Sequence, residues 1–358
     1  MGCHPQAPRL AEQRTADLGD GRRMQPRFAH HMSRQHGLIL RRQVLAAGIT
    51  PVEIAALVRS GDWVIVRRGV YTTRAFWELL DPYVGRPRLE VWAATLTMRM
   101  PHFLSHDSAA YLHGLPILEA SPRLIHVTRI GALGGRTRHG VKHHKAPVST
   151  EQIVFVDDHP VLDIPRTVAD IGREHGIRHA IVAANSALRM GEPRRALRAA
   201  VAPMRSWPYV TVPRLAVEWA DRRCENPGED LTMLILKQLG VGLVEPQFGL
   251  QERGRVAWVD FRVGRHLVEF DGRYKYQREE IGGYADRSAE EVVWDEKRRQ
   301  DWLCGFKLGM SRVVWADLRP DAWVATQGRL LREISDTNTR LGTSIDDLAS
   351  FVIRRRRR

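Results

Sequence analysis

The sequence predicts a mixed α/β protein in three parts: an N-terminal winged helix, an α+β middle domain and a C-terminal α/β sandwich. A length of 358 residues suits two or three domains of about 100 to 200 residues each. Two helical segments and a β-rich hairpin lie near the N-terminus, and helix, hairpin, helix and strand follow one another after residue 225. The expected divisions are a disordered arm (1–32), the winged helix (33–75), the middle domain (76–205), the C-terminal domain (212–335) and a basic tail (336–358).

The composition is that of a globular protein with a basic excess. Hydrophobic residues make up 43% of the chain and charged residues 27%, which argues against disorder as the general state. The 55 Lys and Arg residues outnumber the 41 Asp and Glu residues, giving a formal net charge of +14. Such an excess attracts polyanions through counterion release, so nucleic acid is the expected partner. A basic surface without a partner is the alternative.

The cysteines and the apolar segments bear on the cellular setting. Cys3, Cys224 and Cys304 are odd in number and include no CxxC pair, which argues against a disulfide framework or a zinc ribbon. No run approaches the ~18 apolar residues of a membrane span, and the N-terminus lacks the apolar core of a signal peptide. We therefore expect a cytoplasmic protein without a membrane partner.

The predicted winged helix starts near Gln35. Thr50 is a suitable N-cap with Pro51 at the first helical position, and this second helix ends near Gly61. Residues 63–73 are rich in β-type side chains and turn through an Arg-Arg-Gly sequence, which completes the order of a winged helix. The arginines expected to contact phosphates are Arg41, Arg42, Arg59, Arg67 and Arg68. A solvated basic face is the alternative.

The middle domain is expected to mix helices and strands. The predicted helices cover 89–98, 105–114 and 165–191, with a break at Gly176, and the predicted strands cover 124–127 and 141–144. The Gly- and Arg-rich loop 131–140 either grips phosphate or forms a hairpin tip. His106 and His113 have helical spacing, but no Cys or carboxylate cluster adjoins them in sequence. We expect them to be core or capping residues rather than metal ligands.

The C-terminal domain contains a predicted hairpin that gathers acids. The β-type runs on either side of Gly264 and Arg265 predict a tight hairpin, because Gly first in a two-residue loop suits a type II′ turn. With that loop, Asp260 lies opposite Glu269. Side chains alternate along a strand, so Asp271 points to the same face as Glu269. Three carboxylates are therefore expected to converge.

Opposed like charges repel, so such a hairpin needs a compensating charge. A divalent cation such as Mg²⁺ takes carboxylate oxygens and would relieve the repulsion. The alternative is a solvated polar face with Lys or Arg partners on neighbouring strands. Glu229 lies in the first turn of the preceding predicted helix, where the helix dipole alone favours a negative charge.

Residues from about 226 to 318 resemble the PD-(D/E)xK nuclease superfamily, specifically a bacterial domain of unknown function related to the very-short-patch repair endonucleases. The residues that match its pattern are Glu229, Asp260, Glu269, Asp271, Gly272, Lys297, Arg298 and Asp301. The resemblance implies a restriction-endonuclease-like sandwich with a mixed sheet. It also implies Mg²⁺ or Mn²⁺ as cofactor and DNA as substrate.

The resemblance assigns roles to single residues. The expected catalytic residues are Asp260, Glu269, Lys297 and Glu229, the expected metal ligands are Asp260, Glu269 and Asp271, and Arg298 is expected to contact nucleic acid. The superfamily lysine lies two residues after the acid, where this chain has Asp271, so Lys297 or Lys275 would substitute for it. Related domains often carry a histidine at the segment that is here Arg273 to Tyr276.

The N-terminal two thirds resembles the AbiEi-like antitoxins of bacteria, type IV antitoxins with an N-terminal winged helix. The matching short helix contains Ser105, Ser108, Ala109, Ala110, Tyr111, Leu112, His113 and Gly114. The resemblance implies DNA binding and transcriptional control.

Two functions follow from these resemblances. The first is a DNA-binding protein with a Mg²⁺-dependent endodeoxyribonuclease domain in phage defence or DNA repair. The alternative is an AbiEi-type antitoxin and transcriptional regulator whose nuclease-like domain is catalytically inactive. DNA is the expected partner in both, with a cognate toxin or a second copy of the chain as protein partner, and RNA remains open as a substrate.

Overall fold

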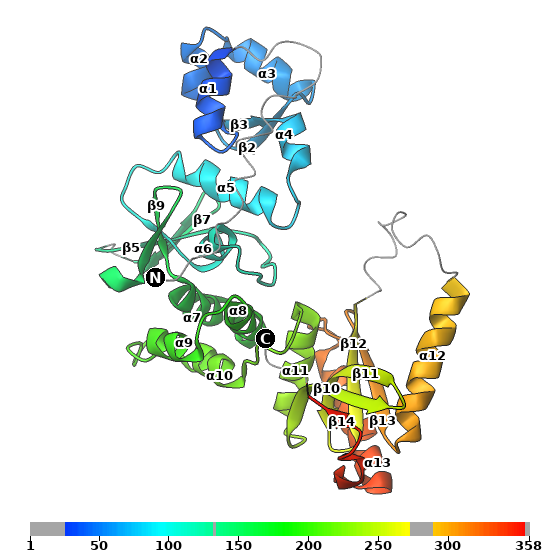
Figure 1. The fold of residues 1–358 in the computed structure, drawn as a ribbon. Coiled ribbons are helices and arrows are strands. Elements are labelled where there is room, and N and C mark those ends of the chain that lie inside the picture. Colours follow the sequence, from blue (N-terminus) through cyan, green and yellow to red (C-terminus); the bar gives the residue numbers. More distant parts are fainter. Residues whose placement is uncertain (1–25, 132–133, 273–288, 355–358) are drawn as a thin grey trace, which may run out of the picture. The chain divides into compact units, whose positions relative to one another are not determined.

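Two units divide the chain in the computed structural model, which describes residues 26–131, 134–272 and 289–354. Unit 1 comprises residues 1–114 and 121–163, and unit 2 comprises residues 115–120 and 164–358. Helices and strands are mixed in both units, as the predicted α/β class requires (Figure 1). The expected middle domain is therefore divided between the units after residue 163.

Unit 1 begins with the predicted winged helix. Its elements are α1 (Pro26–Arg34), β1 (Ile39–Leu40), α2 (Arg41–Ala46), α3 (Pro51–Arg59), β2 (Trp63–Arg67) and β3 (Val70–Thr73). The three strands form a small antiparallel sheet in the order β1-β3-β2. Thr50 and Glu53 form a capping box that starts α3, because each side chain accepts from the backbone N–H of the other.

The predicted N-terminal arm at 1–32 is too long, because helix α1 already begins at Pro26. Phe28 and Met32 are only 5% and 7% exposed and belong to the winged-helix core. The Phe28 ring meets the edge of Trp63, with 6.0 Å between ring centroids. These two apolar residues, one helical turn apart, fold an otherwise polar segment onto the domain. The rest of the arm, residues 1–25, lies outside the described residues.

The remainder of unit 1 is α+β. Its helices are α4 (Arg74–Leu79), α5 (Gly85–Thr95) and α6 (His106–His113), and its strands are β4 (Phe103–Leu104), β5 (Ile125–Arg129), β6 (Arg136–Arg138), β7 (Val141–Lys145), β8 (Ile153–Val156) and β9 (His159–Leu162). These strands form a mixed sheet in the order β6-β7-β5-β4-β9-β8. Within the Arg-rich loop, Arg136–Arg138 form β6 and pair antiparallel with β7, so this part of the segment is a hairpin.

Unit 2 starts with four helices and continues as an α/β layer. The helices are α7 (Ile164–His175), α8 (Ile177–Arg189), α9 (Arg194–Val201) and α10 (Thr211–Trp219). The layer contains α11 (Pro227–Leu239), β10 (Val244–Glu252), β11 (Arg255–Val263), β12 (His266–Asp271), α12 (Ala289–Gly305), β13 (Gly309–Val314), α13 (Trp323–Leu341) and β14 (Val352–Ile353). Its sheet has the order β13-β12-β11-β10-β14 (Figure 1). Only the β12–β13 pair is parallel among these strands, so the sheet is mixed as predicted.

The C-terminal segment corrects the expected basic tail at 336–358. Helix α13 continues to Leu341, and β14 pairs with β10 through Leu250–Val352 and Gly249–Ile353. Leu348 joins the apolar core formed by the sheet and α12, with Val352 packed against it. Burial of these side chains therefore orders the chain up to the terminal arginines, and residues 355–358 lie outside the described residues.

None of the helices in the described parts of the chain combines the length and apolarity that a membrane crossing needs.

Candidate functional site

The β11–β12 hairpin has the predicted turn. Gly264 has φ of 56°, and of the two loop residues it alone lies in the left-handed region, as a type II′ turn requires. The ladder pairs Val263 with His266, Arg262 with Leu267 and Phe261 with Val268, which confirms these three pairs of the predicted register.

The next predicted pair, Asp260 with Glu269, is not among the ladder pairs of β11 and β12. The Asp260 carboxylate instead accepts a hydrogen bond from the backbone N–H of Phe270, at 2.7 Å. The Asp260 side chain therefore satisfies the Phe270 N–H where β11 and β12 no longer pair through their backbones. Asp260 and Glu269 are both half-buried there.

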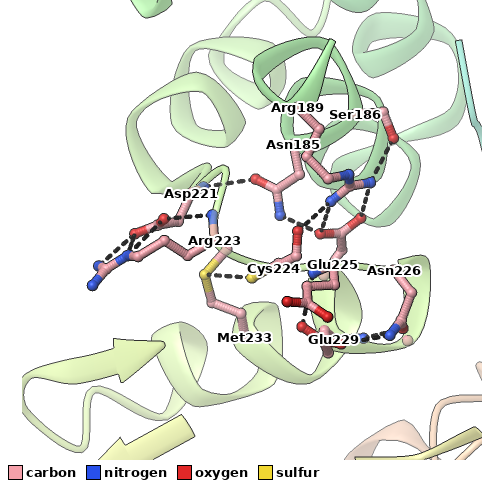
Figure 2. A network of polar contacts seen from close by, with 12 residues as sticks. Asn185, Ser186, Arg189, Asp221, Arg223, Cys224, Glu225, Asn226, Glu229 and Met233 are labelled. Atoms are coloured by element: carbon pink, nitrogen blue, oxygen red, sulfur yellow. Dashed lines mark hydrogen bonds and ion pairs between the residues drawn. The ribbon is translucent and has the colours of Figure 1, made fainter. Parts of the chain in front are cut away.

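Glu229 serves the start of α11. It is 4% exposed, and its carboxylate accepts from the backbone N–H of Glu225 at 2.8 Å and from the side-chain amide of Asn226 at 2.5 Å (Figure 2). Asn226 in turn accepts from the Glu229 N–H, which completes a reciprocal helix cap. The Gln247 side-chain amide, from β10, lies 3.4 Å from the same carboxylate. Glu229 thus joins the helix start to the sheet.

Burial and mutual repulsion perturb this group of acids. Burial, together with the charges of Asp260, Glu225 and Asp230, raises the pKa of Glu229 to about 7, against the opposing hydrogen bond from the Glu225 N–H. Burial, together with repulsion from Glu269 and Glu225, raises the pKa of Asp260 to about 6, although the hydrogen bond from the Phe270 N–H opposes the shift. Four carboxylates therefore act on one another here: the acidic cluster of Glu225, Glu229, Asp260 and Glu269.

Arg299 of α12 reaches the acidic cluster. Its guanidinium donates to Glu269 Oε1 at 2.5 Å and to the Trp258 carbonyl at 2.7 Å. The same charge lowers the pKa of Asp260. Arg312 of β13 adds a weaker contact, with its Nε 4.0 Å from Glu269 Oε2. The like charges of the predicted hairpin are therefore balanced from within the chain.

The structure places Lys297 and Arg298, the two basic residues singled out in the sequence, on the exposed side of α12. Lys297 Nζ lies 5.6 Å from the centre of the Trp294 ring, a cation–π contact. The sequence analysis did not single out Arg299, although its spacing from Leu303 indicates that it faces the sheet. It lies four residues before Leu303, which is fully buried against the sheet, so both occupy one face of α12.

The three predicted metal ligands do not form a tight set. Asp271 ends β12 half-buried, two residues after Glu269. Among the residues that the structure describes, no group of three potential ligand atoms lying within 4.8 Å of one another includes Asp260, Glu269 or Asp271. Lys275 and the rest of the segment from Arg273 to Tyr276 lie outside the described residues.

A buried network anchors α11 to α8. Arg189 donates to both carboxylate oxygens of Asp230, at 2.9 and 3.1 Å, and also to the Cys224 carbonyl at 2.9 Å. Asn185 bridges the Asp230 carboxylate and the Asp221 N–H (Figure 2). Burial raises the pKa of Asp230 to about 6, against the opposing effect of Arg189. This network fixes the chain on both sides of Glu229.

The winged helix carries a second candidate site. Of the five predicted arginines, Arg41, Arg42, Arg59 and Arg68 are exposed. Arg67 is half-buried and donates to the His139 carbonyl at 2.7 Å, and burial lowers its pKa. Sequence alone did not predict that partner, which is distant along the chain.

The exposed face of α3 is mostly small and apolar. Val52 is 73% exposed, Ala55 and Ala56 are exposed beside it, and Arg59 ends the helix. Ile54 packs the opposite face into the core. Helix α3 therefore presents small apolar side chains to solvent, with the exposed acid Glu53 in its first turn and the cation Arg59 in its last.

His113 has the structural role expected of it. Its Nε2 lies 2.7 Å from the Leu162 carbonyl, and burial lowers its pKa.

The winged helix is also the part of the chain that matches a known family. Residues 30–73 match the family described as a transcriptional regulator, AbiEi antitoxin. A comparison with curated proteins finds no match to this chain. The matched segment begins within α1 and ends with β3, so the chain is similar to this antitoxin family over its winged helix.

Proposed function

We propose that the chain is a DNA-binding transcriptional regulator of the antitoxin type. The observation that carries the proposal is the family match over residues 30–73, which runs from within α1 to the end of β3 of the winged helix. Helix α3 would enter the major groove, where Val52 suits the methyl groups of thymine. Arg41, Arg42, Arg59 and Arg68 would contact phosphates, and a net charge of +14 favours such binding.

Fluorescence anisotropy with DNA from the gene's own promoter and with unrelated DNA, over a series of salt concentrations, tests this function. Arg59→Ala should weaken binding and reduce the slope of log K against log salt by about 1. Arg340→Ala, which removes an exposed arginine of α13, should leave the slope unchanged. Equal affinity for both DNAs, or no effect of Arg59→Ala, would contradict the proposal.

A regulator of the antitoxin type also needs a protein partner. We propose a cognate toxin for this role, with self-association into a homodimer as the other arrangement. Co-purification with the product of the adjacent gene, followed by mass measurement of the complex, distinguishes a toxin complex from a homodimer.

As a second function we propose Mg²⁺-dependent hydrolysis of phosphodiester bonds at the acidic cluster, in phage defence or DNA repair. The raised pKa values of Glu229 and Asp260 favour it, because perturbed acids gather where a cation or a proton is handled. Carboxylate oxygens suit Mg²⁺ or Mn²⁺, and Asp260 and Glu269 of the acidic cluster, joined by Asp271 from the end of β12, would supply them. A bound cation would polarise the phosphoryl oxygen and lower the pKa of its water. Arg299 holds Glu269, so a cation must displace it from that carboxylate.

Cleavage of plasmid, single-stranded DNA and RNA with Mg²⁺, Mn²⁺ or EDTA tests this second function. Asp260→Asn and Glu269→Gln should abolish metal-dependent cleavage, and Asp336→Asn, an exposed acid of α13, should not. Cleavage that survives the first two substitutions would exclude this site. If the wild-type protein binds promoter DNA but cuts no substrate under any condition, the nuclease proposal is excluded and the regulator proposal is kept.

A further inference from the structure

Three histidines from separate elements of unit 1 stack on one another. His106 is the first residue of α6, His126 lies in β5 and His144 lies in β7. His106 and His126 are 4% and 1% exposed, and His144 is half-buried. Parallel β5 and β7 pair His126 with Lys142 and Thr128 with His144, so the two strand histidines share one face of the sheet.

The rings are close and nearly parallel. The centroids of His106 and His144 lie 3.8 Å apart with 16° between planes, and those of His126 and His144 lie 5.1 Å apart with 14°. Each ring offers one nitrogen, and the three nitrogens lie within 4.8 Å of one another. His126 Nδ1 and His144 Nε2 are only 2.9 Å apart. Two such nitrogens can share a single proton between them.

The backbone of His106 has an uncommon conformation. Its φ is 50°, in the left-handed region that a non-glycine residue rarely adopts. This conformation brings the ring over His144 while its Nδ1 contacts the Ser105 hydroxyl at 3.0 Å. Strain of this kind is typical of positions that hold a ligand.

We propose that His106, His126 and His144 form a binding site for a borderline-soft divalent metal, Zn²⁺ in the first place. Imidazole nitrogens suit Zn²⁺ and not Mg²⁺, so this centre is chemically distinct from the acidic cluster. Tetrahedral Zn²⁺ with Zn–N bonds of about 2.0 Å separates its nitrogens by about 3.3 Å. The His126–His144 distance is already close to that value. When Zn²⁺ binds, the proton between His126 Nδ1 and His144 Nε2 moves to the other nitrogen of the ring that held it, so that both facing nitrogens present a lone pair to the metal. The stacked rings turn until their nitrogens converge.

Two neighbours support a metal at this point. Asp107 Oδ2 lies 4.0 Å from His126 Nε2, on the far side of the ring from the nitrogen that faces His144. A carboxylate behind a ligating histidine is the usual arrangement in zinc sites, where it fixes the ring. Thr128 is fully buried, and its hydroxyl has no hydrogen-bond partner in the described parts of the chain. An oxygen ligand at the fourth metal position would give that hydroxyl a partner.

Metal titration of the full chain, stripped with EDTA and dialysed, tests the proposal. Competition with a chromophoric chelator should give one Zn²⁺ per chain with Kd of about 1 μM or tighter, and Co²⁺ should produce the visible absorption of a tetrahedral site. Zn²⁺ should raise Tm of the wild type, because it binds only the folded state. Mg²⁺ should produce none of these effects.

Substitutions then assign the ligands. His126→Gln and His144→Gln should each weaken Zn²⁺ at least about 100-fold and abolish the Co²⁺ band, and Asp107→Asn should weaken it about 10- to 100-fold. His143→Gln, one residue away on the opposite face of β7, is the matched control and should bind as the wild type does. His144 is half-buried, so His144→Gln remains informative if His126→Gln does not fold. Unchanged affinity in His144→Gln, or no Co²⁺ band in the wild type, would overturn the site.

Discussion

Arg299 donates to Glu269 at 2.5 Å, and this contact changes what the acidic cluster can do. Without it, a cation from solution would be the simplest relief for the repulsion between Glu269 and Asp260. With it, the chain supplies its own positive charge, and a metal must compete with a guanidinium.

Removing that competitor should strengthen metal binding. Arg299→Gln is expected to tighten Mg²⁺ binding by about tenfold, equivalent to ~1.4 kcal/mol, because Glu269 loses its internal partner. Isothermal titration calorimetry with EDTA-treated protein measures the change. Lys297→Gln, which alters an exposed charge on the same helix, should have no effect. Weaker Mg²⁺ binding in Arg299→Gln would mean that Arg299 positions Glu269 for the metal rather than competing with the metal for it.

The raised pKa of Glu229 predicts how stability depends on pH. Its folded-state pKa is about 7 against an ordinary value of 4.5, so between these values the folded chain holds more of this proton than the unfolded chain. The contribution of Glu229 to the free energy of unfolding is therefore greatest below pH 4.5 and is lost as pH rises through 7. Urea unfolding of wild type and Glu229→Gln across this range measures it. The wild type should lose stability relative to the variant as pH rises, and a constant difference would refute the assigned shift.

The Arg189–Asp230 pair should contribute strongly to stability. The Asp230 side chain is fully buried, so Arg189→Ala leaves its charge without a counterion and should lower the free energy of unfolding by about 3 kcal/mol or more. Chemical denaturation gives the value. The comparison is Arg198→Ala, whose ion pair with Glu218 is exposed on both sides and should change stability little. Similar losses in both variants would show that Asp230 is better solvated than its burial indicates.

Gly228 is required by the close approach of α11 to β12. A Cβ at this position would lie 2.1 Å from two atoms of the Phe270 ring, so Gly228→Ala should cost about 1 to 3 kcal/mol of stability. Gly305→Ala on α12 meets no neighbouring atom and serves as control. Thermal unfolding compares the two, and the added substitution Phe270→Ala should reduce the penalty of Gly228→Ala. If it does not, the clash lies elsewhere.

Local signals in the sequence predicted local structure well. The Gly264-Arg265 loop determined its hairpin and three of its strand pairs, because a two-residue turn leaves little freedom of register. The Thr50-Pro51 start likewise predicted α3. Helix α1 was not predicted because its apolar side is formed mainly by Phe28 and Met32. These two side chains stabilise the helix only by packing into a core that includes the distant Trp63.

The site residues were harder to predict because they meet through the fold. The acids of the hairpin were found, but their partner Arg299 lies 30 residues beyond Glu269 and is recognisable only once α12 is placed on the sheet. The histidine stack was missed for the same reason. His106 was judged by its sequence neighbours, whereas its companions come from β5 and β7.

The short strand β14 has a practical consequence for work with this protein. By covering β10 it protects the backbone edge of the sheet at Gly249 and Leu250. A truncation at residue 335, where the sequence predicted the start of a basic tail, would remove β14 and the end of α13 and uncover that edge. Bare strand edges recruit other chains, so the shortened protein would precipitate or form oligomers that mimic a functional assembly. Affinity tags and deletions are therefore better placed beyond Ile353.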